Sequence, residues 1–434
     1  MTIPPTAPER PPSSVPAQSG WIGLLCFAAG VSIVVKFLPN HDSFTQTLFI
    51  LGITWAGMAL SEIAVARAPW KSETGLARRP RGLRSTLATT SVKLLGFSAT
   101  WLILALVAFA VSHNGGPTAA YAQLPHGVSA FIAGLMIASP AYVFWVDRHM
   151  TDPRDRAWHT GRALQGFFDR SIRDWRGEAV IDHVREWLIK GFFGWLMLYS
   201  AIAKDFPRIF THPAWKDALI DPAVFANMTI WAIFAAEIAF ATIGYFSSFR
   251  PLNAHIRSTN PYALGWFVTF FCYGPLVMMG TDGTLLAYRS ETASWAYWLA
   301  DYTAVMWVWG GLLIASTFGY LWSVFAFGLR FSNLTHRGIV TNGPYRYFKH
   351  PAYLWKVIYW WLFTLPMFSP EGLIKAADMT IVLALVSAVY YARAKAEEKH
   401  LRADPSYRDY EKWIEAYGIV PRILSAFSRR RTEG

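Results

Sequence analysis

Long apolar blocks alternate with short polar segments along most of this 434-residue chain. Each block comes close to or exceeds the ~20 residues that a helix needs to cross the hydrocarbon core of a bilayer. The pattern predicts an all-α protein, a polytopic transmembrane bundle of about ten spans. The predicted spans lie at residues 20–38, 45–66, 90–111, 128–146, 187–203, 222–246, 262–280, 300–327, 352–368 and 373–392.

The polar segments between these blocks sort by charge. Lys and Arg crowd the second, fourth, sixth and eighth segments, whereas intervening segments such as 113–127 and 281–299 hold few cations. An excess of Lys and Arg is typical of loops that stay in the cytoplasm. The alternation predicts that the N-terminus and the C-terminus are both cytoplasmic. It also accounts for the net charge of +12 without any nucleic-acid partner.

The composition changes at three places along the chain. Residues 1–19, rich in Pro, Ser and Thr, are expected to form a disordered tail. The fourth polar segment, 147–190, mixes Arg with aromatic residues, which favours an amphipathic helix at the cytoplasmic interface over a solvated linker. From about residue 330 onward, polar residues with recognisable chemistry cluster. We therefore predict an accessory transmembrane bundle over 20–329 and a catalytic unit with a helical hairpin over 330–434.

A first cluster of polar residues precedes the ninth apolar block. Gly343-Pro344 predicts a turn, and Pro351 suits the first turn of a helix, where its missing N–H is no loss. The helix start would present free amides and the positive end of its dipole beside Lys349 and His350. This pattern is typical of an anion site, although basic residues also serve simply to anchor a helix at the interface.

A second cluster follows the tenth block, where Glu397 and Glu398 precede Tyr407 and Tyr410. Paired carboxylates beside cationic residues can hold an ammonium group or a ribose diol. A solvated, charged helix end has the same composition. Both cysteines lie inside apolar blocks, so neither a disulfide framework nor a metal site is expected.

Together, the two clusters resemble the isoprenylcysteine carboxyl methyltransferase family and, more loosely, the phospholipid N-methyltransferases. The resemblance covers roughly residues 320–423 and implies that the hairpin holds S-adenosyl-L-methionine on the cytoplasmic side. It implies that His350 and the helix start meet the methionine carboxylate and that the paired glutamates hold the amino group or ribose. The implied cofactor-binding residues are Tyr345, Lys349, His350, Pro351, Tyr353, Leu354, Arg393, Glu397, Glu398, Tyr407 and Tyr410.

The implied reaction is methyl transfer to a lipid or lipid-anchored acceptor. A carboxylate acceptor is already deprotonated, so alignment and exclusion of water suffice for O-methylation, which we prefer. A headgroup amine would first lose a proton, and Glu398, His350 or His400 would then be the base. His350 and Glu398 are therefore the catalytic candidates. Ala- and Arg-rich usage favours a bacterial inner membrane over the endoplasmic reticulum for this multi-pass protein.

Four residues depart from the resemblance or from an apolar pattern. The family usually has an Arg where this chain has Lys349, and a Gly where it has Trp355. A Trp at position 355 would narrow or reshape the pocket. Lys356 and Glu237 are charged residues within predicted spans, which marks them as functional hypotheses. Lys356 has the alternative of snorkelling to the near interface.

Two other functions remain open at this stage. NADPH-dependent sterol-type reductases look similar in span number and terminal hairpin, but paired glutamates would repel their multiply phosphorylated cofactor. A transporter or non-catalytic scaffold, with Glu237 in a polar pathway, would have no affinity for either cofactor. Binding of S-adenosylhomocysteine or of NADPH separates the three functions.

Overall fold

The computed structural model describes residues 9–113, 126–169, 176–203, 206–273, 279, 284–288, 293–419 and 421–422. The protein is mostly helical (74%). Within the described residues, six helices are long and apolar enough to cross a membrane. They are α1 (Ala17–Phe37), α2 (Ser43–Ala64), α3 (Leu83–His113), α9 (Pro222–Phe246), α12 (Thr303–Phe325) and α14 (Leu373–Leu401). The predicted total of about ten spans and their orientation stay predictions.

The remaining elements are shorter or less apolar. The helices are α4 (His126–His149), α5 (Arg156–Asp169), α6 (Gly177–Ile189), α7 (Trp195–Ala203), α8 (Phe206–Thr211), α10 (Ala263–Phe270), α11 (Trp295–Trp298), α13 (Pro351–Thr364) and α15 (Pro405–Tyr417). A π-helical turn, η4 (Lys190–Gly194), joins α6 to α7. Short 3-10 turns are η1 (Ala68–Trp70), η2 (Ser72–Thr74), η5 (Pro213–Lys216), η6 (Arg250–Leu252), η7 (Gly328–Arg330) and η8 (Gly343–Arg346). The strands are β1 (Ser258–Thr259) and β2 (Thr335–His336).

Two predicted spans are shorter helices than the sequence suggested. The seventh block is helical only over α10, and its residues 274–278 and 280 lie outside the described part of the chain. The ninth block was predicted to run to residue 368, but α13 ends at Thr364 because Leu365 adopts a φ of 42°. Pro366 follows, and proline disfavours helical geometry in the residue before it. The 14 residues of α13 extend about 21 Å, less than the ~30 Å hydrocarbon core.

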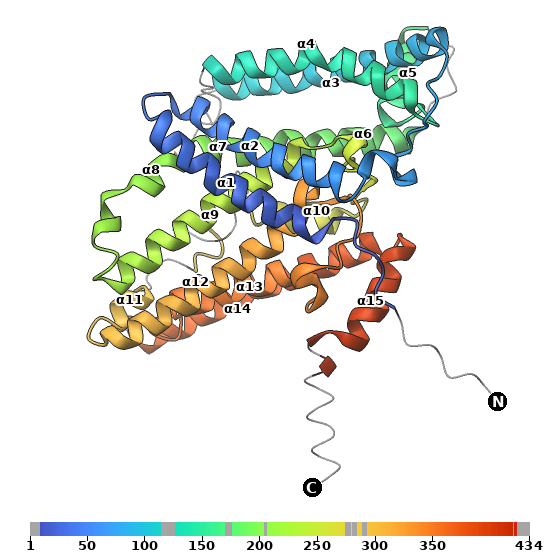
Figure 1. The fold of residues 1–434 in the computed structure, drawn as a ribbon. Coiled ribbons are helices and arrows are strands. Elements are labelled where there is room, and N and C mark those ends of the chain that lie inside the picture. The colour runs from blue at the N-terminus through green and yellow to red at the C-terminus, as the bar shows by residue number, and fades with distance from the viewer. Residues whose placement is uncertain are drawn as a thin grey trace, which may run out of the picture.

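The helices pack in two groups (Figure 1). The hairpin of α1 and α2 lies against α9, and α9, α12 and α13 form a row that continues into α14. The buried core of this group includes Ile50, Phe240 and Val324. At Gly20 in α1 the approach to α12 is so close that a Cβ would lie 2.4 Å from the carbonyl oxygen of Phe325. The second group joins α3 to α4 and α5 at the edge of the molecule.

The cation-rich polar segments meet at one end of the molecule. Strands β1 and β2 pair antiparallel, with Ser258 opposite His336, and so join the segment after α9 to the segment after α12. The Arg330 guanidinium binds the Glu62 carboxylate at the end of α2, and the Arg156 guanidinium donates to the carbonyl of Ile256. These segments alternate along the sequence and therefore share one side, where α5 and α15 also lie (Figure 1).

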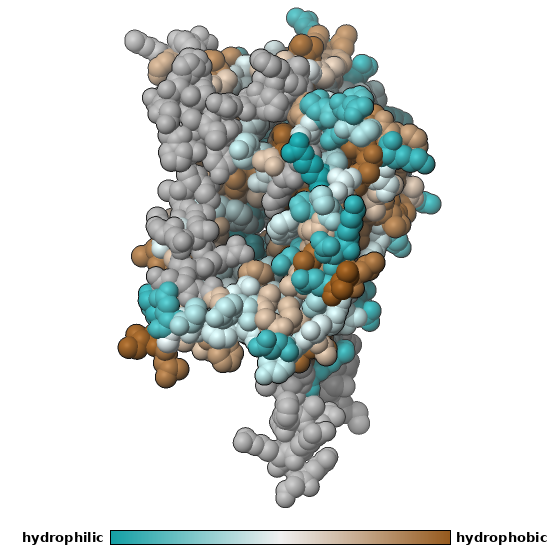
Figure 2. Space-filling model, turned by 90° about the vertical axis from the view of Figure 1, so that its left-hand side faces the viewer, coloured by the Kyte–Doolittle hydropathy of each residue, from teal (hydrophilic) through white to brown (hydrophobic). Residues whose placement is uncertain are grey.

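The opposite end has a different surface. Figure 2 views the molecule from that side and shows hydrophilic and hydrophobic residues intermixed, beside grey areas that are not described. Large apolar side chains are exposed between α8 and α9 and at the start of α14: Leu219 (84%), Ile220 (79%), Leu373 (87%) and Ile374 (88%). A polar aqueous surface would not favour this exposure, whereas a membrane boundary does.

The expected disordered tail differs from the structure in its second half. Residues 9–16 lie extended against the segment that precedes α13. The Ser14 amide donates to the Ile339 carbonyl at 2.8 Å, and Asn342 Nδ2 donates to the carbonyl of Val15 at 2.7 Å. Helix α1 then begins at Ala17. Partners 300 or more residues away hold this stretch, and composition alone cannot reveal them; residues 1–8 lie outside the described part.

The segment 147–190 forms two helices, α5 and α6, in place of the one amphipathic helix that was predicted. Residues 170–175 between them lie outside the described residues. Apolar side chains are exposed on both helices, with Phe167 at 81% and Ile181, Val184 and Leu188 at about half. Exposed apolar side chains on charged helices suit the membrane interface, and that placement remains a prediction.

Candidate functional site

The start of α13 is set by its local sequence. Turn η8 contains Gly343 at a φ of 56°, a conformation that glycine tolerates without strain. Pro351 then occupies the first turn of α13, which no side chain caps among the residues that the structure describes. The first amides of a helix lack partners within the helix. The uncapped helix start lies beside His350, and its use as an anion site remains a prediction.

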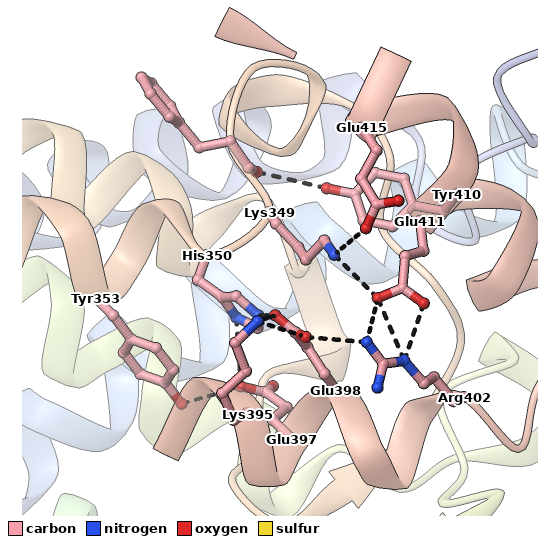
Figure 3. A network of polar contacts seen from close by, with 11 residues as sticks. Lys349, His350, Tyr353, Lys395, Glu397, Glu398, Arg402, Tyr410, Glu411 and Glu415 are labelled. Carbon is pink, nitrogen blue, oxygen red and sulfur yellow. Dashed lines mark hydrogen bonds and ion pairs between the residues drawn. The ribbon is translucent and has the colours of Figure 1, made fainter. Parts of the chain in front are cut away.

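The antiparallel hairpin of α13 and α14 brings the two sequence clusters together. His350 Nε2 lies 3.1 Å from Glu398 Oε1, and the Tyr353 hydroxyl donates to Glu397 Oε2 at 3.0 Å. The His350 and Tyr353 rings stack at 5.8 Å with an interplanar angle of 9°. Figure 3 shows both pairs facing each other across the hairpin. Four of the predicted site residues thus form one contiguous polar group.

The two adjacent glutamates have different environments. The Glu398 side chain is 2% exposed and accepts hydrogen bonds from Lys395 at 3.0 Å and Arg402 at 3.3 Å as well as contacting His350. The Glu397 side chain is 41% exposed, and its contacts are the Tyr353 hydroxyl and, at 3.8 Å, His350 Nδ1. Glu398 is therefore fully engaged by the protein. Glu397 has the carboxylate surface that a ligand can reach.

Lys349 contacts α15 and not the pair of glutamates. Its ammonium donates to Glu411 at 2.9 Å and to Glu415 at 3.0 Å. Burial alone would lower the pKa of Lys349, but these two hydrogen bonds, together with the negative charges of Glu398 and Glu411, outweigh it and raise the pKa. Hydrogen bonds from Arg402 and Lys349 lower the pKa of Glu411. In place of the bidentate Arg of the family, this chain has a point charge that fastens α15 over the start of α13 (Figure 3).

Other predicted cofactor-binding residues have structural contacts. The Tyr410 hydroxyl donates to the backbone carbonyl of Tyr345, and the Tyr345 hydroxyl donates to that of Ser323. Tyr407 packs in an apolar cluster with Tyr410, and its hydroxyl has no hydrogen-bond partner among the described residues. Burial raises the pKa of both Tyr407 and Tyr410. Leu354 is 37% exposed. The predicted role of these residues in cofactor binding remains a prediction.

Arg393 lies one turn of α14 before Glu397. Its guanidinium stands over the rings of Tyr353 (5.1 Å), Tyr273 (5.4 Å) and Tyr390 (5.8 Å), and one of its nitrogens donates to Asn333 Oδ1 at 2.6 Å. The sequence did not point to Tyr273 or Tyr390, because aromatic residues are common in apolar blocks. Asn333 could have been singled out in the sequence, because it is a polar residue shortly before the first motif.

Trp355, which the sequence led us to expect to narrow or reshape the pocket, packs against α12, and its effect on the pocket remains a prediction. Its indole lies on Gly319 of α12, where a Cβ would come within 2.6 Å of the ring. It belongs with the apolar residues packed around the α1, α2, α9 and α12 core. The indole can point this way because Gly319, 36 positions earlier in the chain, has no side chain. His400, a candidate base, likewise turns away and contacts the Ser258 hydroxyl at 2.9 Å.

Long apolar helices that end in a hairpin with a His–Glu and a Tyr–Glu contact define a multi-pass membrane protein with an enzyme-like polar centre. Residues 309–403 match the model of the isoprenylcysteine carboxyl methyltransferase (ICMT) family. The C-terminal part of the chain therefore resembles this family, as its motifs predicted, and the match supports a membrane methyltransferase. The matched range begins inside α12, before the predicted boundary at residue 330. Comparisons with curated proteins and with solved structures gave no match.

Proposed function

We propose that this protein is an integral membrane S-adenosyl-L-methionine-dependent methyltransferase that acts on a lipid or lipid-anchored acceptor. The observation that carries the proposal is the half-exposed Glu397 carboxylate beside Tyr353 and His350, at an uncapped helix start inside the ICMT-matched range. Carboxyl O-methylation is the preferred reaction, and headgroup N-methylation is the second possibility.

The residues present fit the chemical groups of this cofactor. A carboxylate suits the amides at the start of α13 together with His350. An amino group suits Glu397, which has room for a second donor besides Tyr353. The faces of the stacked His350 and Tyr353 rings favour a nearby sulfonium cation. When bound, the cofactor supplies an electrophilic methyl group.

The chain's own residues would then orient the reacting groups, exclude water and hold the transferred proton. Glu398, held by Lys395 and Arg402, fixes the His350 ring and so acts as a positioning residue. An oxyanion acceptor needs only alignment in a water-poor site. An amine acceptor must lose its proton, and the His350–Glu398 pair is the base that the hairpin offers for this step.

The wider arrangement supports access from both phases. We propose that the end where the cation-rich segments meet is cytoplasmic, which gives the soluble cofactor a path to Glu397. The acceptor would enter from the lipid side of the α13–α14 hairpin. Residues 330–434, together with α12, would form the catalytic unit, and the bundle before α12 would be accessory. A bacterial inner membrane remains the proposed location.

Calorimetric titration of the detergent-purified protein with S-adenosylhomocysteine and with NADPH tests the proposal. We expect S-adenosylhomocysteine to bind and NADPH not to bind. Glu397→Gln should weaken the binding at least tenfold, whereas Glu415→Gln on α15, 63% exposed, should leave it unchanged. Absence of S-adenosylhomocysteine binding would remove the proposed function. Binding that survives Glu397→Gln would remove only the assignment of this residue.

A further inference from the structure

Lys356 is a cation placed within the apolar part of α13. It lies six residues after His350, which is about 9 Å further along the helix. A charged side chain at such a depth is costly unless something stabilises it. Snorkelling would direct the side chain back toward the start of α13, which is also the direction in which helical Cα–Cβ bonds lean.

The Lys356 ammonium lies among aromatic rings inside the bundle. Its Nζ lies 5.6 Å from the ring centroid of Trp360, one turn further from the start of α13. It also faces the rings of Tyr320 in α12, at 5.1 Å, and Tyr390 in α14, at 5.8 Å. Three helices therefore surround the ammonium with aromatic faces. Lys356 points into the bundle and is half-buried there.

The aromatic surroundings stabilise the ammonium but do not neutralise it. Aromatic faces attract a cation through their quadrupole, but they carry no net charge. In the described part of the chain, no carboxylate lies within ion-pair distance of Lys356. The Tyr320 hydroxyl donates to Oε1 of Glu237 in α9 at 2.9 Å. Tyr320 therefore contacts both Lys356, through its ring, and Glu237, through its hydroxyl.

A second cation adjoins the same ring. The Arg393 guanidinium lies 5.8 Å from the centroid of Tyr390, which Lys356 also contacts, and Tyr353 links this ring to the Glu397 site. The interior of the bundle next to the candidate site therefore carries one cation from α13 and one from α14. A protonated amine there meets like charges, whereas an anion gains two favourable partners in a medium of low dielectric constant.

We propose that Lys356 binds the acceptor and selects a lipid oxyanion, of the carboxylate or phosphate class, over a lipid amine. The inference rests on the proposed function and settles the choice between anionic and amine acceptors within it. Lys356 is a specificity-determining residue, which holds the anionic group below the Glu397 site so that the reacting oxygen lies toward His350 and Tyr353.

Four ligands that share the same hydrocarbon chain but differ in headgroup test the proposal: oleate, oleyl phosphate, oleylamine and oleyl alcohol. Their affinities for the detergent-purified, full-length protein would be measured in the presence of S-adenosylhomocysteine. We expect oleate or oleyl phosphate to bind at least tenfold more tightly than the amine and the alcohol. Whichever of the two anions binds more tightly identifies the headgroup class.

Lys356→Met should abolish the preference for the anion while leaving S-adenosylhomocysteine affinity unchanged. Lys356→Arg should keep the preference, because the charge remains. Lys36→Met, at an exposed lysine in the last turn of α1, is the control and should bind all four ligands as the unsubstituted protein does.

The two proposals fail in different ways. Loss of S-adenosylhomocysteine binding from the unsubstituted protein contradicts the methyltransferase assignment. If that binding is intact but the anion is not preferred, or if Lys356→Met retains the preference, the acceptor-selecting role of Lys356 is wrong. Should Lys356→Met fail to fold, a loss of the preference in Lys356→Arg gives the same negative answer.

Discussion

The Glu62 carboxylate and the Arg330 guanidinium form a two-point hydrogen-bonded ion pair, at 2.6 and 3.1 Å, between residues 268 positions apart. Both side chains are fully buried, at 0% and 1% exposure. Arg330 also donates to the carbonyls of Asn253 and Leu252. The pair thus joins the end of α2, the segment after α9 and the turn before the ICMT-like motifs.

Removing one partner of this pair should destabilise the whole bundle. A buried charge left without its partner costs about 3–5 kcal/mol. We therefore expect Glu62→Gln and Arg330→Met each to lower the thermal midpoint in detergent strongly. The matched control is Glu73→Gln, because Glu73 is 49% exposed in its pair with Arg257 and such pairs contribute about 0–1 kcal/mol. Equal effects of Glu62→Gln and Glu73→Gln would contradict the assigned role.

Glu397 and Glu398 should separate ligand binding from stability. Glu398→Gln removes the buried negative charge that Lys395 and Arg402 share and leaves one acceptor oxygen in place of two, which we expect to cost about 1–3 kcal/mol of unfolding free energy. Glu397→Gln should leave the thermal midpoint unchanged within error and reduce cofactor affinity. Thermal unfolding and calorimetry on the same preparations measure the two effects. A reversed pattern would show that the glutamates have the opposite roles.

Buried histidines should make the folded protein sensitive to acid. Burial lowers the pKa of His255 to about 3 and that of His336 to about 4. The unfolded chain, with a His pKa of about 6.5, then binds more protons than the folded one between these values. Stability is therefore complete above about pH 6.5 and declines as the pH falls toward 4, by roughly 1 kcal/mol for each histidine at pH 5.5.

Substitution of one of these histidines tests the sign of the effect. His255→Gln should reduce the difference in unfolding free energy between pH 7.5 and pH 5.5, whereas His41→Gln, at an exposed histidine after α1, should not change it. A larger difference in His255→Gln would mean that the folded state binds the proton more tightly than the unfolded chain.

Gly319 and Trp355 should show strong energetic coupling. A Cβ at position 319 would overlap the indole ring, and such overpacking costs about 1–3 kcal/mol. We expect Gly319→Ala to destabilise the protein, and Trp355→Ala to destabilise it by leaving a cavity. The double variant should lose less than the sum of the two. Additive losses in this double-mutant cycle would show that the two residues do not depend on each other.

The sequence predicted those features that depend on local properties. Blocks of apolar residues gave the long helices, since helix length in a bilayer follows from block length alone. The early end of α13 also had a local signal, Pro366. We overlooked it because Pro366 lies among apolar residues, so that the apolar block continues past it. The short segment between the last two apolar blocks predicted the hairpin that brings His350 and Glu398 to the same end, but not their direct contact.

Features that depend on distant partners were not predictable from the sequence. The direction of Trp355 depends on Gly319, and that of Lys349 depends on Glu411 and Glu415, which α15 brings back over the start of α13. The unequal burial of Glu397 and Glu398 arises from the rotation of α14 against its neighbours. Residue type and spacing fix none of these, because they describe neighbours along the chain and not neighbours in space.

The extended stretch before α1 has a consequence for the order of events during biosynthesis. The hydroxyl of Ser13 accepts from the amide of Thr341, 328 residues later, and Arg10 lies 5.9 Å above the ring of Trp413. This stretch must therefore wait for residues that are synthesised more than 300 positions later before it gains these partners. Protection of the peptide bond after Glu9 from a glutamate-specific endopeptidase would then report that the C-terminal unit has been synthesised and assembled.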